Sequence, residues 1–198
     1  MAVSIEEIKR LKDLTGIGLT DAKAALTEAD GDFDKALEAL RKKGMTKAEK
    51  KGEREARQGT VDSYVHSERI GALVEVNCET DFVARTDGFK SFVRDIAMHV
   101  AASAPEFVSV DQVPEDERER VRAEFVEKAK NDGKPAEMID NIVEGMLKKH
   151  FAEKCLLDQP YIKNPDQTVG DYLKENIAKF GENTVIRQFS RIELGEVN

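Results

Sequence analysis

Three stretches with the residue pattern of β-strands set the tightest limit on how this chain can fold. Residues 60–65 alternate apolar and polar side chains, and residues 70–76 form a run rich in β-branched residues. The residues between them are polar, so we expect the two stretches to pair as a hairpin. Residues 185–192 show a strand pattern near the other end of the chain. We expect this last stretch to join the hairpin in a three-stranded antiparallel sheet.

Most of the remaining sequence has the apolar spacing of helices. In the C-terminal part, apolar side chains recur every three or four residues in the segments 89–100, 121–129, 138–151 and 169–177. Helices that pack on one face of a small sheet give an α+β fold. The sequence therefore predicts an α+β domain over residues 59–198, with the sheet covered by helices.

Residues 1–44 predict a separate module of three helices. Ser4, with Glu7 three residues later, is typical of a helix start. The segment Thr15–Gly18 breaks this first helix, because its two glycines tolerate backbone angles that other residues avoid. Gly31 is expected to end a second helix and Gly44 a third. Such a short module has limited stability of its own and usually docks onto a partner.

A basic connector, residues 45–58, joins the module to the second domain. From Arg41 to Arg57 the sequence has eight basic and three acidic residues, although the whole chain carries a formal net charge of −8. A run of this kind is usually a solvated linker, either a charged helix or a mobile tether. The alternative is a positive arm that steers the protein onto an acidic partner.

Composition excludes several classes of protein. An acidic chain is a poor general binder of nucleic acid, and no segment is apolar over the roughly 20 residues that a membrane helix needs. The N-terminus has no secretory or transit-peptide pattern, so we expect a cytoplasmic protein without a membrane partner or direct nucleic-acid partner. Cys78 and Cys155 are far apart and form neither a disulfide framework nor a zinc motif.

No motif predicts a catalytic site, a metal site or a bound cofactor. Residues 16–21 begin like a dinucleotide-binding loop but have Asp21 where the third glycine belongs. Gly133 and Lys134 are followed by a proline and lack the upstream glycine of a phosphate-binding loop. The three histidines are scattered, which is typical of ordinary packed or surface residues. We therefore predict that the chain is not an enzyme and holds no metal or cofactor.

One segment, Asn77–Arg85, does not fit a purely structural role. It follows the second strand and ends before the helix that contains Phe89, so Phe82 is an aromatic residue at a connecting tip. A large apolar side chain in such a loop often anchors an interface. Equally, Phe82 and Val83 could turn inward as a hydrophobic staple for the next helix. Position in the sequence alone favours neither interpretation.

Three blocks of the sequence resemble the elongation factor Ts family. The first block comprises Thr15–Leu26 and Glu28–Asp32, within the helical module. The second is Val74–Arg85, which contains the segment Thr-Asp-Phe-Val. The third comprises Gln159–Tyr161 and Asn164–Gly170. The blocks occur in the family's order and span nearly the whole chain, and the helical module would correspond to the family's ubiquitin-associated-like domain.

This resemblance implies a guanine-nucleotide exchange factor for elongation factor Tu in protein biosynthesis. In the family, the Thr-Asp-Phe-Val tip inserts near the magnesium site of the GTPase, dislodges the ion and promotes release of GDP. By match, the tip would consist of Thr80, Asp81, Phe82 and Val83. The contacts of the helical module with the GTPase domain would involve Gly16, Gly18, Leu19, Lys23 and Lys47. His99 and the third block would help to hold the partner's other domains.

Two further expectations follow. Longer members of the family carry two related core halves and an inserted coiled-coil hairpin, whereas this chain has a single set of strands; we therefore expect a homodimer that supplies the second half. The alternative to exchange is a ubiquitin-associated-type adaptor, in which the module binds a partner and the remainder is scaffold. RNA binding through the basic connector is a third, less favoured possibility, because aromatic residues are not interleaved with the basic ones.

Overall fold

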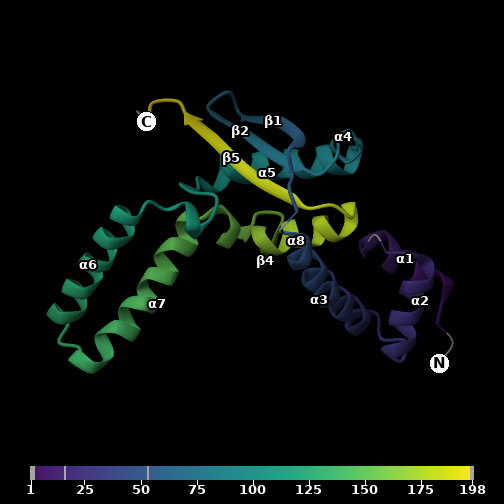
Figure 1. Ribbon diagram of the computed structural model, residues 1–198, viewed down its shortest axis with the longest axis horizontal. Coiled ribbons are helices and arrows are strands. Elements are labelled where there is room, and N and C mark those ends of the chain that lie inside the picture. The colour runs from purple at the N-terminus through teal and green to yellow at the C-terminus, as the bar shows by residue number, and fades with distance from the viewer. Residues whose placement is uncertain (1–2, 16, 53, 197–198) are drawn as a thin grey trace. The chain divides into compact units, whose positions relative to one another are not determined.

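The computed structural model describes residues 3–15, 17–52 and 54–196, and for residues 41, 43 and 45–50 it describes the helix but not the side chains. Over these residues the architecture is α+β, with eight α-helices and a three-stranded antiparallel sheet (Figure 1). The helices are α1 (Ile5–Thr15), α2 (Leu19–Glu28), α3 (Phe33–Lys51), α4 (Asp81–Ala84), α5 (Asp87–Ser103), α6 (Glu115–Asn131), α7 (Ala136–Lys154) and α8 (Val169–Phe180). The strands are β1 (Gln58–His66), β2 (Ile70–Cys78), β3 (Pro160–Tyr161), β4 (Asn164–Thr168) and β5 (Thr184–Glu193). The short 3-10 turns are η1 (Val110–Gln112) and η2 (Leu156–Asp158).

The predicted three-stranded sheet is confirmed, with β2 between β1 and β5. Along β2, Ala72, Val74, Val76 and Cys78 are buried, whereas Leu73 is exposed. Because neighbouring residues of a strand point to opposite faces, one face of β2 is covered and the other is open to solvent.

A glycine is required where β1 begins. Gly59 has a φ of +148°, and a Cβ atom placed there would lie 2.1 Å from the backbone oxygen of Val76. A side chain would therefore overlap the backbone of the neighbouring strand. The hairpin owes its close approach at this end to the missing Cβ.

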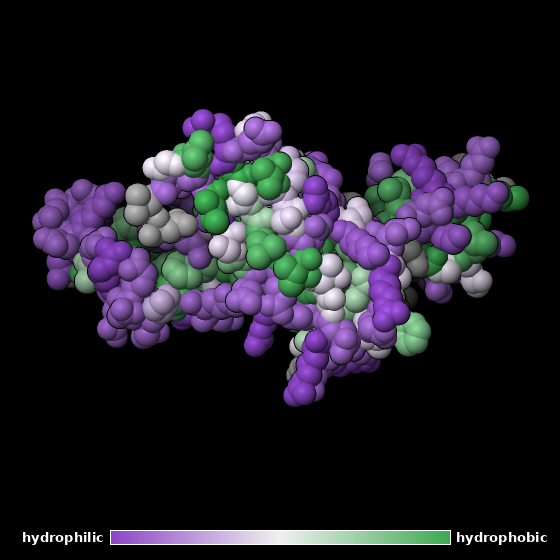
Figure 2. All heavy atoms as spheres, turned by 90° about the horizontal axis from the view of Figure 1, so that it is seen from above, coloured by the Kyte–Doolittle hydropathy of each residue, from purple (hydrophilic) through white to green (hydrophobic). Residues whose placement is uncertain are grey.

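The open face of the sheet carries several exposed apolar side chains. Each strand contributes exposed hydrophobic side chains to it, and Figure 2 shows apolar residues gathered in the central part of the face that it views. In the strands and just beyond β5, these side chains are Val61, Val65, Leu73, Ile192 and Leu194.

The chain forms two compact units. One contains α1 to α4 and nearly all of α8, and the other contains α6, α7, β3 and β4. The sheet strands and α5 contribute residues to both units.

The three helices predicted for the N-terminal segment are present, but the end of the third is wrong. α1, α2 and α3 share a small core whose fully buried side chains are Leu11, Ala22, Leu26 and Ala36. The helix α3 does not end at Gly44 but continues to Lys51, through the first half of the basic connector. At Gly44 a Cβ atom would lie 3.4 Å from the Cβ of Ala178 in α8, so this glycine accompanies a close approach of helices. Packing has overridden the tendency of glycine to end a helix.

Each unit also has a core of larger side chains. In the first, rings of α5 and α8 contact each other, with Phe89 and Phe180 centroids 5.5 Å apart and Phe92 and Tyr172 centroids 5.3 Å apart. In the second, α6 and α7 pack as an antiparallel pair, and the buried side chains of this cluster are Val113, Val121, Phe151 and Cys155.

Two elements were not expected from the sequence. The strands β3 and β4 form a separate two-stranded antiparallel ladder just before α8. The single turn α4 follows β2 and carries the segment that resembled a family signature. Both are too short to show a period in their hydrophobic residues.

Candidate partner-binding site

Phe82 projects into solvent from a single helical turn. Thr80 caps this turn, α4, because its hydroxyl accepts a hydrogen bond from the Val83 N–H at 3.4 Å. Residues two apart in a helix are separated by about 200° around its axis, so Phe82 and Ala84 lie on opposite sides. Ala84 is buried, and the Phe82 side chain is accordingly 81% exposed. An inward staple is therefore wrong for Phe82, and its ring is available to a partner.

Two glutamates fasten this turn to the loop between α8 and β5. The carboxylate of Glu182 accepts hydrogen bonds from the Thr80 N–H at 3.0 Å and from the Thr80 hydroxyl at 2.6 Å. In return, the carboxylate of Glu79 accepts a hydrogen bond from the Asn183 N–H at 2.6 Å. Hydrogen bonds to charged groups are among the stronger ones in proteins. The base of the tip is thus held firmly, although its end is free.

The remaining polar groups of the tip have ordinary partners. Asp81 forms an exposed ion pair with Arg85, one helical turn later, at 2.9 Å. The buried Cys78 thiol donates to the backbone oxygen of Thr80 at 3.1 Å. Burial raises the pKa of the Cys78 thiol, with a further contribution from the nearby charge of Glu182, so the sulfur stays protonated and unreactive at neutral pH.

The helical module exposes apolar side chains at the connection between α1 and α2. Gly18 occupies the N-cap position of α2, and Leu19 begins that helix with 52% of its side chain exposed. Lys23 is also exposed, one turn further along α2. Leu14, in the last turn of α1, adds a second exposed leucine, which no sequence motif marks. The connection is therefore able to make both apolar and charged contacts.

Two other residues expected at this surface cannot be placed there. Gly16 lies outside the described residues. Lys47 lies within α3, but its side chain is also outside what the structure describes. Both assignments therefore stay predictions.

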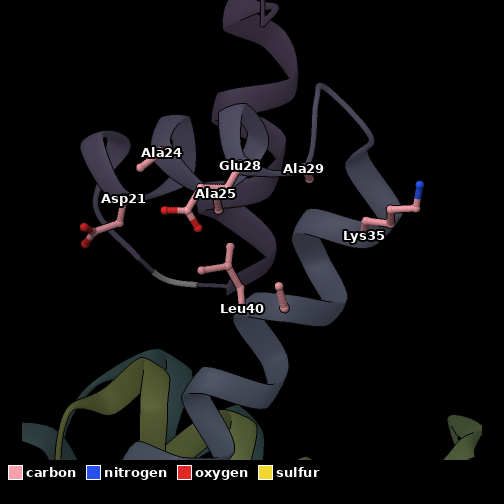
Figure 3. A pocket seen from close by; sticks show the side chains of 8 residues that line it. Asp21, Ala24, Ala25, Glu28, Ala29, Lys35 and Leu40 are labelled. Carbon is pink, nitrogen blue, oxygen red and sulfur yellow. The ribbon is translucent and has the colours of Figure 1, made fainter.

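A shallow groove of about 380 Å³ runs along the surface between α2 and α3 (Figure 3). Its floor is made of small apolar side chains, mainly alanines, with Leu40 from α3. The carboxylates of Asp21 and Glu28 stand on the α2 side, and Lys35 extends away from them at the start of α3. The groove has no cluster of side chains that would perform chemistry, and we regard it as part of the module's surface.

His99 is not a surface residue, and its expected direct contact with a partner is corrected accordingly. Its side chain is 0% exposed. The ring Nδ1 accepts a hydrogen bond from the Ile162 N–H at 3.2 Å, so the proton must be on Nε2, which donates to the Gln159 side-chain oxygen at 3.0 Å. Burial lowers the pKa of His99, partly offset by this bond to Gln159. His99 therefore holds the β3–β4 turn from inside as a neutral ring.

The described residues contain no group of three or more histidine, cysteine or acidic side chains placed to hold a metal ion. Among the same residues, no helix is both long enough and apolar enough to cross a membrane. The free cysteines Cys78 and Cys155 are both buried, and burial raises the pKa of Cys155 to about 11.

Comparisons with known proteins agree with one another. Residues 45–196 match the sequence model of the family described as Elongation factor TS. Proteins described as Elongation factor Ts from Carboxydothermus hydrogenoformans, Thermoanaerobacter sp. (strain X514) and Geobacter sulfurreducens are 54%, 51% and 48% identical to the chain. These alignments cover 98%, 98% and 99% of this chain and 90%, 96% and 91% of the respective relatives.

Proposed function

The chain belongs to the elongation factor Ts family, and we propose that it acts on elongation factor Tu as a guanine-nucleotide exchange factor. Membership of the family implies a role in translation elongation. The partner in this proposal is a GTPase, and the proposed activity is to accelerate the loss of its bound GDP.

The observation that carries the proposal is the exposed ring of Phe82 on a turn whose base is fixed. A rigidly supported aromatic side chain can enter a partner's surface at little cost in conformational entropy. We propose that Phe82 inserts between elements of the GTPase domain near its magnesium site. Asp81 then accepts hydrogen bonds from the displaced backbone, Thr80 holds the base of the turn, and Val83 packs beside the ring.

Displacement of those elements would weaken the binding of the magnesium ion to the GTPase. Mg²⁺ requires nearly ideal octahedral geometry, so a small movement of its ligands lowers its affinity sharply. Loss of the ion removes positive charge from beside the phosphates of GDP, and the nucleotide dissociates. No side chain of this chain needs to make or break a covalent bond, so we propose that the protein is not an enzyme.

Thermodynamic linkage makes this scheme reversible. If the protein weakens the binding of GDP to the GTPase, then bound nucleotide weakens the binding of the protein by the same factor. Incoming GTP would therefore release the exchange factor and free it for another cycle.

We propose that the helical module supplies a second contact with the GTPase domain. In this proposal it is a ubiquitin-associated-like domain whose exposed surface includes Gly18, Leu19 and Lys23. Gly16 and Lys47 belong to this contact by resemblance to the family alone. Leu14 and Leu19 are exposed leucines at one connection between helices, which supports an apolar docking surface. The tip would then act on the magnesium site while the module provides affinity.

We also propose that the protein is a homodimer. The open face of the sheet offers exposed apolar side chains in adjacent strands, including Leu73 and Ile192. A second copy of the chain would cover them, since a symmetric dimer buries the same surface on both subunits. Light scattering at micromolar concentration should give the mass of two chains, and Ile192→Asp should give the mass of one. A single-chain mass for the unmodified protein would rule out this dimer.

Release of a fluorescent GDP from elongation factor Tu tests the exchange activity directly. The unmodified protein should accelerate release, and Phe82→Ala should lower that acceleration by about 30-fold or more, the usual loss at a central aromatic contact of about 2 kcal/mol. Met138→Ala, which truncates another exposed apolar side chain, in α7, serves as the control. Equal acceleration by Phe82→Ala and the unmodified protein would contradict the tip mechanism. Binding without any acceleration would instead indicate an adaptor.

A further inference from the structure

The support of the tip comes from a residue far away in the sequence. Glu182 lies between the end of α8 and the start of β5, and it is half-buried. One of its carboxylate oxygens accepts the Thr80 N–H and the other accepts the Thr80 hydroxyl. Both oxygens of this side chain are thus engaged with a single residue at the base of α4.

The hydroxyl of Thr80 links Glu182 to the direction of the helical turn. A hydroxyl has one proton, and here it is donated to Glu182 at 2.6 Å. Its lone pairs are then left to accept the Val83 N–H at 3.4 Å, which is the capping bond of α4. Glu182 therefore fixes the rotation of the hydroxyl, and the hydroxyl caps the turn that carries Phe82, which backbone hydrogen bonds such as Ala84 N–H to Thr80 O at 3.3 Å also hold.

Asn183 ties the same loop to the segment that follows α3, within the basic connector. Its side chain is buried, and its amide nitrogen donates to the backbone oxygens of Arg54 at 2.6 Å and Gly52 at 3.3 Å. Its own N–H donates to Glu79, next to Thr80. The loop thus holds the tip with one residue and the segment that follows α3 with the next.

We propose that Glu182 is a positioning residue for nucleotide exchange, which sets the direction of Phe82 through Thr80. This inference rests on the proposed function, because it requires the tip to act on the GTPase. Both carboxylate oxygens of Glu182 are bound to Thr80, so we expect its effect on the partner to pass through the cap. Loss of Glu182 should misdirect the tip but leave the other contact surfaces of the chain intact.

The proposal is tested by measuring the rate of GDP release from elongation factor Tu over a range of concentrations of this protein, which gives a maximal rate and a half-saturating concentration. Glu182→Ala should lower the maximal rate of GDP release about tenfold to a hundredfold, since misplaced groups in a preorganised site cost that much, and should change the half-saturating concentration much less. Glu182→Gln should restore part of the rate, because its amide oxygen still accepts one hydrogen bond from Thr80. Glu137→Ala, at an exposed glutamate in α7, is the matched control and should leave both values unchanged.

A double-mutant cycle separates positioning from a general structural role. If Glu182 acts only through the tip, Glu182→Ala should have no further effect on release when Phe82 is already alanine. Amide hydrogen exchange adds a readout that needs no partner, because the Thr80 N–H should lose protection in Glu182→Ala while the amides of α5 keep theirs.

The outcomes also distinguish the two proposals. Suppose that Glu182→Ala stimulates GDP release at the unmodified maximal rate while Phe82→Ala stimulates it slowly. That result would overturn the positioning role of Glu182 alone. An equal further loss in the Phe82→Ala background would likewise overturn it, because the effect would not pass through the tip. If Phe82→Ala stimulates GDP release as fast as the unmodified protein does, the tip mechanism is wrong and the positioning role of Glu182 is wrong with it.

Discussion

Two segments of the chain that resemble family signatures are built in opposite ways. In the tip, Thr80–Val83, the hydrogen bonds lie at the base and the largest side chain faces solvent. In the segment Gln159–Tyr161, two of the three side chains turn inward: Gln159 binds His99, and the Tyr161 hydroxyl donates to Asp95 at 3.2 Å. Resemblance alone marks both segments as functional, whereas exposure shows that the Phe82 ring is open to another protein and that the Gln159 and Tyr161 side chains are not.

The difference has a clear energetic consequence. At the tip, Phe82 contributes little to the folded state because it buries little apolar surface there. At the turn, His99 and Tyr161 are almost completely buried, so their contacts are a direct part of the stability of the fold. Substitutions should therefore affect stability at the turn and nucleotide exchange at the tip.

The largest effect on stability is expected from His99→Ala. The change empties a buried site and leaves the Ile162 N–H and the Gln159 oxygen without their partner, which should cost about 3 kcal/mol of unfolding free energy. Urea unfolding followed by circular dichroism measures this, at a fixed protein concentration because a dimer would add a concentration dependence. His66→Ala, at an exposed histidine, should change the value by less than about 0.5 kcal/mol. Equal stability of the two variants would show that the buried contacts of His99 contribute no more to the stability of the fold than those of an exposed histidine.

Acid should weaken the β3–β4 turn, which His99 holds. The folded-state pKa of His99 is lowered by burial, so the unfolded chain binds the proton more readily. The stability from the neutral ring is therefore complete above the ordinary pKa of about 6.5 and is lost as the pH falls towards the lowered value. The slope is at most about 1.4 kcal/mol per pH unit, because one proton is involved.

Urea unfolding between pH 7.5 and pH 5 would measure this slope. His99→Gln should show a smaller fall in stability than the unmodified protein, because a glutamine at this position does not titrate. Asp95 and Lys163, which form an ion pair at 2.6 Å beside the same turn, remain in both proteins and cancel in the difference. Identical pH profiles would show that the ring's protonation does not limit stability.

The same contrast explains what the sequence could and could not predict. The hairpin, β5 and the long helices were predictable because hydrophobic period depends on neighbours within one element. The end of α3 was not, because Gly44 continues the helix where α3 passes close to Ala178, a contact far away in the sequence. The turn α4 was also missed, since four residues are too few to show a period.

In the candidate site, too, the features that depend on contacts distant in the sequence could not be predicted. Position in the sequence left the direction of Phe82 open, because it depends on which side of α4 Ala84 packs. The buried state of His99 could not be read from a local pattern either, since its partners, Gln159 and Ile162, lie some 60 residues along the chain. Glu182 carried no motif at all, and only its two hydrogen bonds to Thr80 single it out.

A much smaller change in stability is expected at the tip. Phe82→Ala should alter the unfolding free energy by less than about 0.5 kcal/mol, because the exposed ring has little buried area to lose. Together with a large loss of GDP release, this result would be the reverse of His99→Ala, which should stimulate release nearly normally once folded. A loss of stability above 1 kcal/mol would indicate that the ring packs on the protein more closely than its exposure implies.

The smallest effect is expected from Arg85→Ala, which tests whether surface charge holds the tip. The Asp81–Arg85 pair joins exposed side chains one turn apart, so its contribution should be about 0.3–0.5 kcal/mol and should vanish at high salt. Because Glu182 and the Thr80 cap already fix the turn, removal of the arginine should leave GDP release unchanged. A clear slowing of release would mean that Arg85 contacts the GTPase or orients Asp81 towards it. In that case exchange would depend on the exposed charges of the tip as well as on its hydrogen-bonded base. The tip would then differ from the Gln159–Tyr161 segment in its surface charges as well as in the exposure of its aromatic ring.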